Sequence, residues 1–239
     1  MPPGIDMAET ESARLNKYIA SSGFCSRREA DSYIENRKVT VNGVTADLGT
    51  RVFPGDSVAV EGREVVPKDD KIYLALHKPL GITCTTDTRD PDNIIDYIGY
   101  KERIFPIGRL DKNSSGLILL TNDGDSVNKL LRAEFGHEKE YEVRTDRKIG
   151  ADFKEKMEKG IPLDGKITLP CTVTVTGNHT FRIILKQGLN RQIRRMCEYL
   201  GYRVVKLRRI RFRNIKLDGI KYGEYRLLTK REIDDLLNP

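Results

Sequence analysis

The sequence predicts an α+β protein in which a small helix–helix–hairpin domain precedes a mixed, largely antiparallel β-sheet domain flanked by helices. Two observations predict this architecture. Before residue 62, two short helical patterns are followed by a strong hairpin signal. Beyond residue 70, short strand patterns are mixed with a few helices, without the regular alternation of strand and helix that gives a parallel sheet.

The first domain is expected to span residues 13–61. Arg14–Gly23 has apolar residues at helical spacing and ends on a glycine suited to a helix C-terminus. Ser26–Glu29 forms a capping box that starts a second helix. Asn42-Gly43 between β-branched residues predicts a tight hairpin, and Ser57–Val60 is a final strand.

The flanking segments set the remaining boundaries. Residues 1–12 are acidic, lack the order of a secretory signal, and are expected to form a disordered tail. Residues 62–70 are polar, carry Pro67 and predict a linker. Residues 71–239 then form the larger domain.

Apolar runs predict the strands of the larger domain. Ile72–Leu76 and Leu117–Leu120 are short and fully apolar, as buried strands are. Asp125 is placed to cap a helix that follows the second run. The same reasoning predicts strands at 141–143, 172–175 and 181–185, and a charged helix at 152–159.

The charge of the chain is unevenly distributed. Net charge is +7, yet Arg182–Arg226 alone holds 14 Lys or Arg against 3 Asp or Glu, so the rest is acidic on balance. A concentrated basic segment indicates a polyanion partner, with nucleic acid the first candidate and a solvated charged face the alternative. No apolar run reaches the roughly 20 residues that span a membrane, so no membrane partner is expected.

The four cysteines are far apart, without a Cys-x-x-Cys pair, and there are three histidines. This pattern predicts reduced thiols in a cytoplasmic protein, with neither a disulfide framework nor a zinc site. There is also no phosphate-binding Walker loop. We therefore expect no metal and no cofactor.

The basic segment contains a helical and a strand-like pattern. Between Leu189 and Gly201 an apolar face opposes a face carrying Arg191, Arg194 and Arg195. Beyond it, Arg209, Arg211 and Arg213 alternate with Ile210 and Phe212, which predicts a strand with one arginine-lined face. Rows of guanidinium groups suit RNA phosphates.

Gly108–Gly116 is a polar stretch ahead of a buried strand, and it contains Asp111. An aspartate in such a place is usually a turn former, and residue chemistry alone favours that interpretation. The alternative is a reactive carboxylate on a loop held by strands. Its neighbours Arg109 and Lys112 would then keep it ionised as a nucleophile or base.

Several segments, taken in order, resemble the bacterial RNA pseudouridine synthases of the RsuA/RluB/RluE/RluF branch. Residues 13–61 are similar to the small RNA-binding domain of a ribosomal small-subunit protein. The motifs that carry the resemblance are Lys78–Gly81, Gly108–Asp111 with Gly116–Gly124, Glu138–Tyr141, and Gln187–Met196.

The resemblance implies roles for individual residues. Asp111 would be the catalytic carboxylate, Tyr141 the active-site tyrosine that stacks on a flipped base, and Arg194 the partner of Asp111. Arg109 would insert into the space that the flipped nucleotide leaves in the RNA. Further substrate contacts are expected from Lys78, Lys139, Arg191, Arg195, Arg209 and Arg211, and RNA contacts of the first domain from Arg14, Lys17, Arg27 and Arg28.

The resemblance also implies a substrate. A uridine in structured RNA is expected to become pseudouridine, in 23S ribosomal RNA or an assembly intermediate near the peptidyl-transferase centre, with a tRNA anticodon uridine as a second target. The enzyme is expected to be a monomer. The alternatives are a non-catalytic RNA-binding ribosome-assembly factor and a hydrolytic glycosidase, which would pair Asp111 with Asp123 or Asp125.

Overall fold

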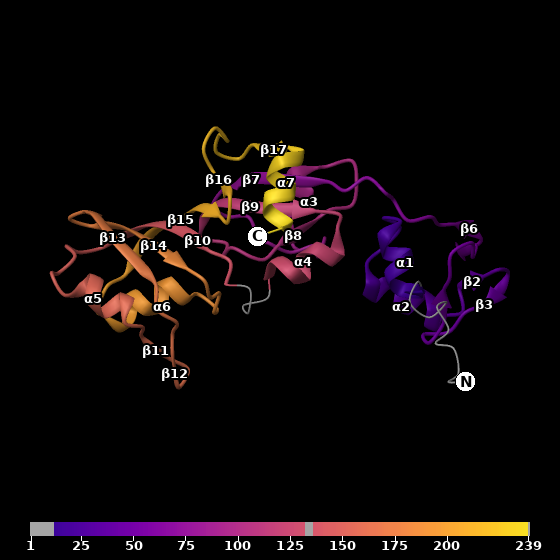
Figure 1. The fold of residues 1–239 in the computed structure, drawn as a ribbon, viewed down its shortest axis with the longest axis horizontal. Helices are drawn as coiled ribbons and strands as arrows, with labels where there is room; N and C mark the ends of the chain where they lie inside the picture. The colour runs from indigo at the N-terminus through magenta and orange to yellow at the C-terminus, as the bar shows by residue number, and fades with distance from the viewer. Residues whose placement is uncertain (1–11, 132–135, 239) are drawn as a thin grey trace, which may run out of the picture. The chain divides into compact units, whose positions relative to one another are not determined.

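The computed structural model describes residues 12–131 and 136–238 (Figure 1). The chain divides into two compact units, residues 1–71 and 72–239. Of the predicted tail, only Ser12 lies within the described residues, and its hydroxyl accepts a hydrogen bond from Arg51 Nε at 2.7 Å.

The small unit has two helices followed by a hairpin sheet, as predicted. Ser26 and Glu29 form the capping box of the second helix, and Asn42 and Gly43 both have the positive φ that a type I′ turn requires. The helices are α1 (Leu15–Ser21) and α2 (Arg27–Glu35). The sheet order is β3 (Val44–Thr45), β2 (Val39–Val41), β5 (Val58–Val60) and β6 (Arg63–Glu64), and β1 (Ala13–Arg14) pairs with β4 (Arg51–Val52).

This unit continues beyond residue 61. Arg63 of β6 pairs with Val60 of β5, and Val65 is buried in the core of the unit. Lys68 N donates a hydrogen bond to Ser21 O at 3.1 Å. Residues 63–65 therefore belong to the sheet and core of the small unit and not to a linker.

The large unit is built on a mixed, mostly antiparallel sheet that has nine strands in the described residues. Its main path is β13 (Thr172–Gly177), β14 (Thr180–Leu185), β10 (Lys139–Thr145), β15 (Val204–Phe212), β9 (Ser115–Thr121), β7 (Tyr73–Lys78) and β17 (Tyr225–Leu227). Off this path, β8 (Phe105–Ile107) pairs with β9 and β16 (Ile215–Lys216) with β15. A separate hairpin joins β11 (Pro162–Leu163) to β12 (Lys166–Ile167).

Both faces are buried at the centre of this sheet. Along β9, Leu117 and Leu119 enter one hydrophobic cluster, and Ile118 and Leu120 enter another. α4 (Gly124–Leu131) and α7 (Lys230–Leu237) pack in the first cluster, and α3 (Ile94–Ile98) packs in the second. Burial on both faces explains why the sequence shows unbroken apolar runs at β7 and β9.

At the other end of the sheet, two helices cover one face. Phe153 and Met157 of α5 (Phe153–Glu158) join Ile193 and Met196 of α6 (Gln192–Tyr199) in a third cluster with the inward-facing residues of β10, β13 and β14. The predicted apolar face of the helix within residues 189–201 is confirmed. None of the helices among the described residues has the length and apolar character to cross a membrane.

One local prediction is wrong. The first turn of α4 is capped by Asp123 and not by Asp125, because Asp123 Oδ1 accepts hydrogen bonds from the backbone nitrogens of Asp125 (3.1 Å) and Ser126 (3.4 Å). The sequence analysis also does not predict α3, α7 or most of the two-residue strands.

Candidate active site

A cleft of about 490 Å³ opens beside the junction of β9 and β15. Its walls come from the loop ahead of β9, from β10 and β15, and from the segment between β14 and α6. Residues predicted to act in the site are brought together here: Arg109, Asp111, Lys139, Tyr141, Arg191 and Arg209.

The junction depends on a glycine. β9 and β15 run parallel, and their register pairs Ser115 with Arg208 and Gly116 with Arg209. Gly116 has φ +110°, and a Cβ at this position would overlap the backbone of Arg209. Only glycine therefore allows the two backbones to approach so closely, and this approach positions the Asp111 loop just ahead of β9.

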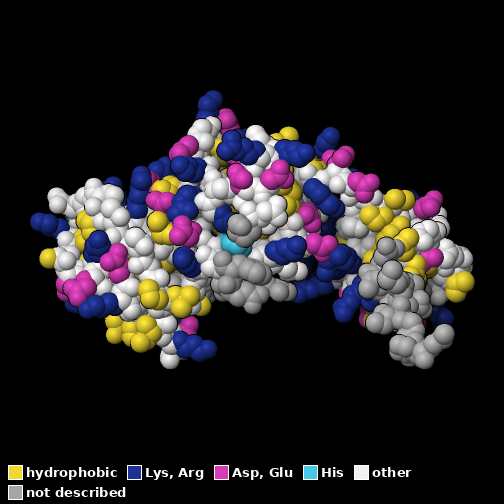
Figure 2. All heavy atoms as spheres, viewed as in Figure 1, with side chains coloured by type: hydrophobic (Ala, Val, Ile, Leu, Met, Phe, Trp, Pro, Cys, Tyr) yellow, Lys and Arg dark blue, Asp and Glu magenta, His cyan; other side chains and the backbone are white. Residues whose placement is uncertain are grey.

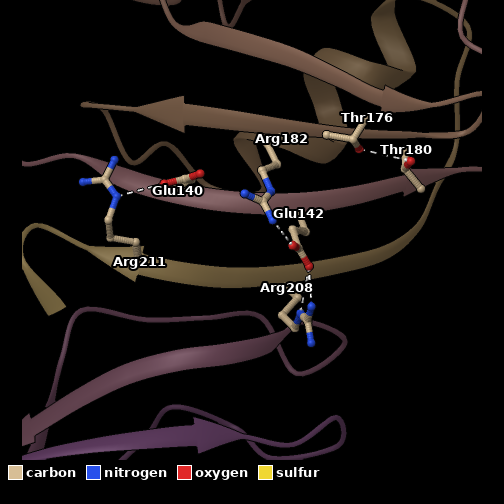
Figure 3. Close-up of polar contacts among 7 residues, drawn as sticks. All are labelled: Glu140, Glu142, Thr176, Thr180, Arg182, Arg208 and Arg211. Carbon is tan, nitrogen blue, oxygen red and sulfur yellow. Dashed lines mark hydrogen bonds and ion pairs between the residues drawn. The ribbon is translucent and has the colours of Figure 1, made fainter. Parts of the chain in front are cut away.

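A β-bulge shapes the cleft wall on β15. Tyr141 of β10 pairs with Arg209 and Glu140 with Arg211, so Ile210 is the extra residue. A bulge breaks the two-residue alternation of a strand. Arg209 therefore faces the cleft with Tyr141, and Arg211 lies on the opposite face of the sheet, with Glu140 (Figure 3).

The Asp111 carboxylate is free to act in the cleft. The turn is closed by its backbone carbonyl, which accepts a hydrogen bond from Ser114 N at 2.9 Å. Within residues 12–131 and 136–238 the carboxylate itself accepts no hydrogen bond, so the turn-former interpretation is not supported. Its Oδ2 lies 3.8 Å from Arg191 Nη1 and 3.8 Å from Arg194 Nε, and the side chain is 32% exposed.

Arg194 lies beside this carboxylate and is held in place by hydrogen bonds. Its side chain is 13% exposed, and its Nη atoms donate to Asn113 O (2.7 Å), Ser114 Oγ (3.2 Å) and Val204 O (3.2 Å). Its buried Nε has no hydrogen-bond partner in the described chain and faces Asp111. Burial and Arg191 lower the pKa of Arg194 and Asp111 opposes this shift, but a guanidinium stays charged.

Tyr141 and Lys139 form the β10 wall. Tyr141 packs against two hydrophobic clusters of the large unit and lines the cleft. The Lys139 ammonium lies 5.8 Å from the centre of the Phe212 ring. Burial, and then Arg209, lowers the pKa of Lys139. An aromatic ring beside cations can hold a flat, electron-rich base.

Lys78 does not reach the cleft, which corrects its predicted role as a substrate contact. The side chain is fully buried, and its ammonium donates to Pro79 O and Ile82 O, both at 2.8 Å. Burial lowers the pKa of Lys78 to about 8. Lys78 therefore stabilises the turn that follows β7 through these two hydrogen bonds.

The predicted arginine-lined face of β15 is also wrong, because the bulge puts Arg209 and Arg211 on opposite faces of the sheet. Arg209 is 3% exposed and its Nε donates to Leu117 O at 2.6 Å. Arg211 pairs with Glu138 (3.0 Å) and Glu140 (2.9 Å). Arg209 is therefore held by the backbone of β9, and Arg211 is neutralised by two glutamates.

The other predicted basic residues differ in exposure and in their ion-pair partners. Arg109 is exposed at the cleft and has no partner in the part of the chain that the structure describes. Arg195 lies outside the cleft lining and forms two hydrogen bonds with Asp164, at 2.6 and 2.9 Å. Lys112 pairs with Asp92 at 2.7 Å and so does not flank Asp111 as expected. In the small unit Arg14, Arg27 and Arg28 are exposed, and Lys17 is half-buried.

Two polar side chains of the cleft were not predicted. Lys186 and Asn190 line it from the segment between β14 and α6. Asn190 lies within the motif Gln187–Met196, and Lys186 lies within the basic segment, so both had a signal in the sequence. The motif did not show which of its side chains turn inward.

The cleft contains one carboxylate in the described residues, that of Asp111. Asp123 is engaged elsewhere, accepting hydrogen bonds from Tyr73 (2.8 Å) and Ser126. A pair of carboxylates, as the glycosidase alternative requires, is therefore not formed. Among the same residues, no group of His, Cys, Asp and Glu side chains could hold a metal ion.

Basic side chains are spread along the large unit and interspersed with acidic ones (Figure 2). The concentrated charge of Arg182–Arg226 is therefore divided among several elements and partly paired. The cations that remain around Asp111 give the cleft a local positive character suited to RNA.

An α+β fold whose cleft holds one carboxylate among cations and an aromatic ring suits an enzyme that acts on a base of RNA. Comparison with known proteins identifies the family. Residues 72–199 match the family model of RNA pseudouridylate synthase, and residues 13–58 match that of the S4 domain. The chain belongs to the RNA pseudouridylate synthase family and is an enzyme that isomerises uridine in RNA.

Individual relatives agree with this assignment. The chain is 53% identical to the dual-specificity RNA pseudouridine synthase RluF of Salmonella typhi, over 96% of this chain and 80% of the relative. It is 35% identical to the ribosomal large subunit pseudouridine synthase B of Bacillus subtilis, over 93% and 95%. A crystal structure of a pseudouridylate synthase superposes with a TM-score of 0.69 at 28% identity, covering 93% of this chain and 99% of that one.

Proposed function

We propose that the enzyme modifies a uridine of 23S ribosomal RNA near the peptidyl-transferase centre, and that a tRNA anticodon uridine is a second substrate. The names of the relatives support this proposal, since one is called a dual-specificity RNA pseudouridine synthase and another a ribosomal large subunit pseudouridine synthase. We further propose that the protein acts as a monomer in the cytoplasm, on mature RNA or an assembly intermediate.

The single observation that carries the proposed mechanism is the free Asp111 carboxylate, 3.8 Å from two guanidinium groups. In the reaction the bond between uracil N1 and ribose C1′ breaks, the base rotates, and C5 bonds to C1′ while the C5 proton leaves. Asp111 either attacks C1′ or removes the C2′ proton. Both routes require an ionised and oriented carboxylate, which the guanidinium groups of Arg191 and Arg194 stabilise.

The cleft walls would hold the base while it is detached. Tyr141, which lines the cleft, would stack on the flipped uracil, and its hydroxyl would assist transfer of the C5 proton. Lys139 and Arg191 line the same cleft and would contact the nucleotide. Arg109, exposed at the mouth, would fill the space that the flipped nucleotide leaves in the RNA.

The small unit would add RNA affinity and no chemistry. Its exposed cations Arg14, Arg27 and Arg28, together with Lys17, lie on or beside α1 and α2. Phosphate contacts of this kind position an RNA without reading its sequence.

Mapping pseudouridine in ribosomal and transfer RNA, from cells with and without the gene, tests the target. We expect one 23S site near the peptidyl-transferase centre, and one tRNA anticodon site, to lose the modification without the gene and to regain it with the intact gene. Retention of every pseudouridine, with defects only in ribosome assembly, would instead support the non-catalytic assembly factor.

A further inference from the structure

The sheet formed by β13, β14, β10 and β15 has a polar face opposite the one covered by α5 and α6. The cross-strand register places Glu142 of β10 between Arg182 of β14 and Arg208 of β15 (Figure 3). Thr174, Arg144 and Lys206 are exposed on the same strands. We name the side chains on this side the polar sheet face.

Glu142 orients two guanidinium groups on the polar sheet face. Arg182 Nη2 donates to Glu142 Oε1 at 2.9 Å, and Arg208 donates to Oε2 through Nε at 3.2 Å and also through Nη2. Burial opposes ionisation of Glu142, but the hydrogen bonds from Arg208 and Arg182 outweigh it and lower the pKa. The two arginine side chains remain 50% and 35% exposed, so their other N–H groups are available.

A second pair of cations lies beside this group without a carboxylate. Arg144 and Lys206 are directly opposite each other across β10 and β15. Neither has an ion-pair or hydrogen-bond partner in the described chain. Like charges in directly opposed positions destabilise a strand pair. The fold gains nothing from this pair, whereas an anion bound between the two side chains would use both.

These groups line a shallow pocket of about 370 Å³. Its lining includes four cations and one carboxylate, and hydroxyl groups from Thr176 and Thr180, which are within 3.2 Å of each other. Guanidinium, ammonium and hydroxyl donors are the groups that bind RNA phosphates. We propose that the polar sheet face is a second RNA-binding site, which holds phosphate groups of an RNA segment distinct from the one in the cleft.

The two sites lie on opposite sides of the same strands. Tyr141 and Lys139 of β10 face the cleft, whereas Glu142 and Arg144 belong to the polar sheet face. A single flipped nucleotide cannot reach both. The inference rests on the proposed function, because only a large, folded RNA such as ribosomal RNA presents two segments to one protein.

The test compares two double variants of the full chain. Arg144→Ala/Lys206→Ala removes the unpaired cations, and Lys154→Ala/Lys166→Ala removes two exposed cations from α5 and β12 as a control. The probe is a 23S ribosomal RNA transcript with 5-tritiated uridine. Filter retention at several salt concentrations reports binding, and tritium release reports catalysis.

For the variant at the polar sheet face we expect the Kd to rise roughly tenfold at low salt, and the slope of log affinity against log salt to fall in magnitude by about 1.4 to 1.8, as loss of two phosphate contacts predicts. Tritium release at saturating RNA should stay within about twofold of wild type, and the melting temperature should not fall, because opposed like charges are removed. Arg144→Lys should retain binding.

Equal Kd and equal salt slope in the two double variants would overturn the proposal. The polar sheet face would then fit an acidic protein partner instead of RNA. A loss of turnover at saturating RNA without a change in affinity would overturn it as well. If wild type bound the transcript but released no tritium, the proposed 23S target would fail. The difference in RNA binding between the two double variants would still show whether the polar sheet face is a second RNA-binding site.

Discussion

Arg194 connects three parts of the site. Its Nη atoms hold the Asp111 loop through Asn113 O and hold β15 through Val204 O, while its Nε faces the carboxylate. With its side chain 13% exposed, it has little surface to offer RNA. Its geometry thus indicates a positioning residue that acts through Asp111, whereas basic pattern alone could equally indicate a phosphate contact.

Arg194→Ala should therefore lower turnover much more than affinity. We expect kcat to fall by roughly 100-fold or more, because displacement of a reacting group by about 1 Å has that effect, and RNA Kd to change by less than about threefold. Tritium release and filter binding measure the two quantities. Arg195→Ala, whose partner is the surface residue Asp164, is the matched control. Equal losses in kcat and affinity would place Arg194 among the phosphate contacts.

Lys78 makes stability depend on pH. Its folded pKa is lowered to about 8 by burial, and an unfolded lysine titrates near about 10.4. Between these values the unfolded state binds more protons, so this group makes the free energy of unfolding rise with pH. Relative to Lys78→Met, wild type should gain stability from about pH 8 to pH 10, by at most roughly 3 kcal/mol. Urea unfolding measures this, and a difference that does not vary with pH would contradict it.

At the scale of elements, the junction of β9 and β15 determines where the Asp111 loop lies. Gly116→Ala introduces a Cβ into the Arg209 backbone at a φ of +110°. We expect a loss of at least about 3 kcal/mol in the free energy of unfolding, or failure to fold, because clash and backbone strain add.

Gly165→Ala separates these two causes. Gly165 also has a positive φ, +74°, but a Cβ there has no neighbour within 4 Å. Its substitution should show the strain alone, on the order of 1 kcal/mol. Denaturant unfolding compares the two variants. If Gly116→Ala were as mild as Gly165→Ala, the close approach of the strands would not be required.

The elements that the sequence predicted are those with local causes. The Ser26–Glu29 capping box, the Asn42-Gly43 turn and the apolar run of β9 depend on neighbours in the chain. The bulge at Ile210 depends on pairing with β10, which is remote in sequence, and it moves Arg209 and Arg211 to opposite faces.

The same distinction applies to the site. Motif resemblance identified Asp111, Tyr141 and the arginines near them, and the structure places these around one cleft. The burial of Lys78 and the pairing of Arg195 with Asp164 depend on contacts across the fold, so no pattern of spacing could predict them.

At the scale of the whole molecule, we propose that chemistry and part of the RNA affinity reside in different units. The large unit contains the entire cleft, and residues 1–71 form a separate compact unit. A shortened protein that begins at Lys71 should fold, retain turnover on concentrated short RNA, and bind the full substrate more weakly. Melting, tritium release and filter binding measure the three properties. Unchanged affinity after truncation would contradict an RNA-binding role for the small unit.

The central claim is that Asp111 performs the chemistry. Asn is nearly isosteric with Asp, and the turn at this position is closed by the backbone carbonyl of residue 111, which the substitution retains. Asp111→Asn should therefore fold with a change of no more than about 1 kcal/mol and bind RNA within a few-fold of wild type. An amide cannot serve as the nucleophile or base.

The most direct measurement is tritium release from 5-tritiated uridine RNA by purified Asp111→Asn, with Asp164→Asn as a control for loss of an exposed carboxylate that pairs with Arg195. Release should fall by several powers of ten in the first variant and stay near normal in the second. Near-normal release by Asp111→Asn would show that the Asp111 carboxylate is not required for the reaction.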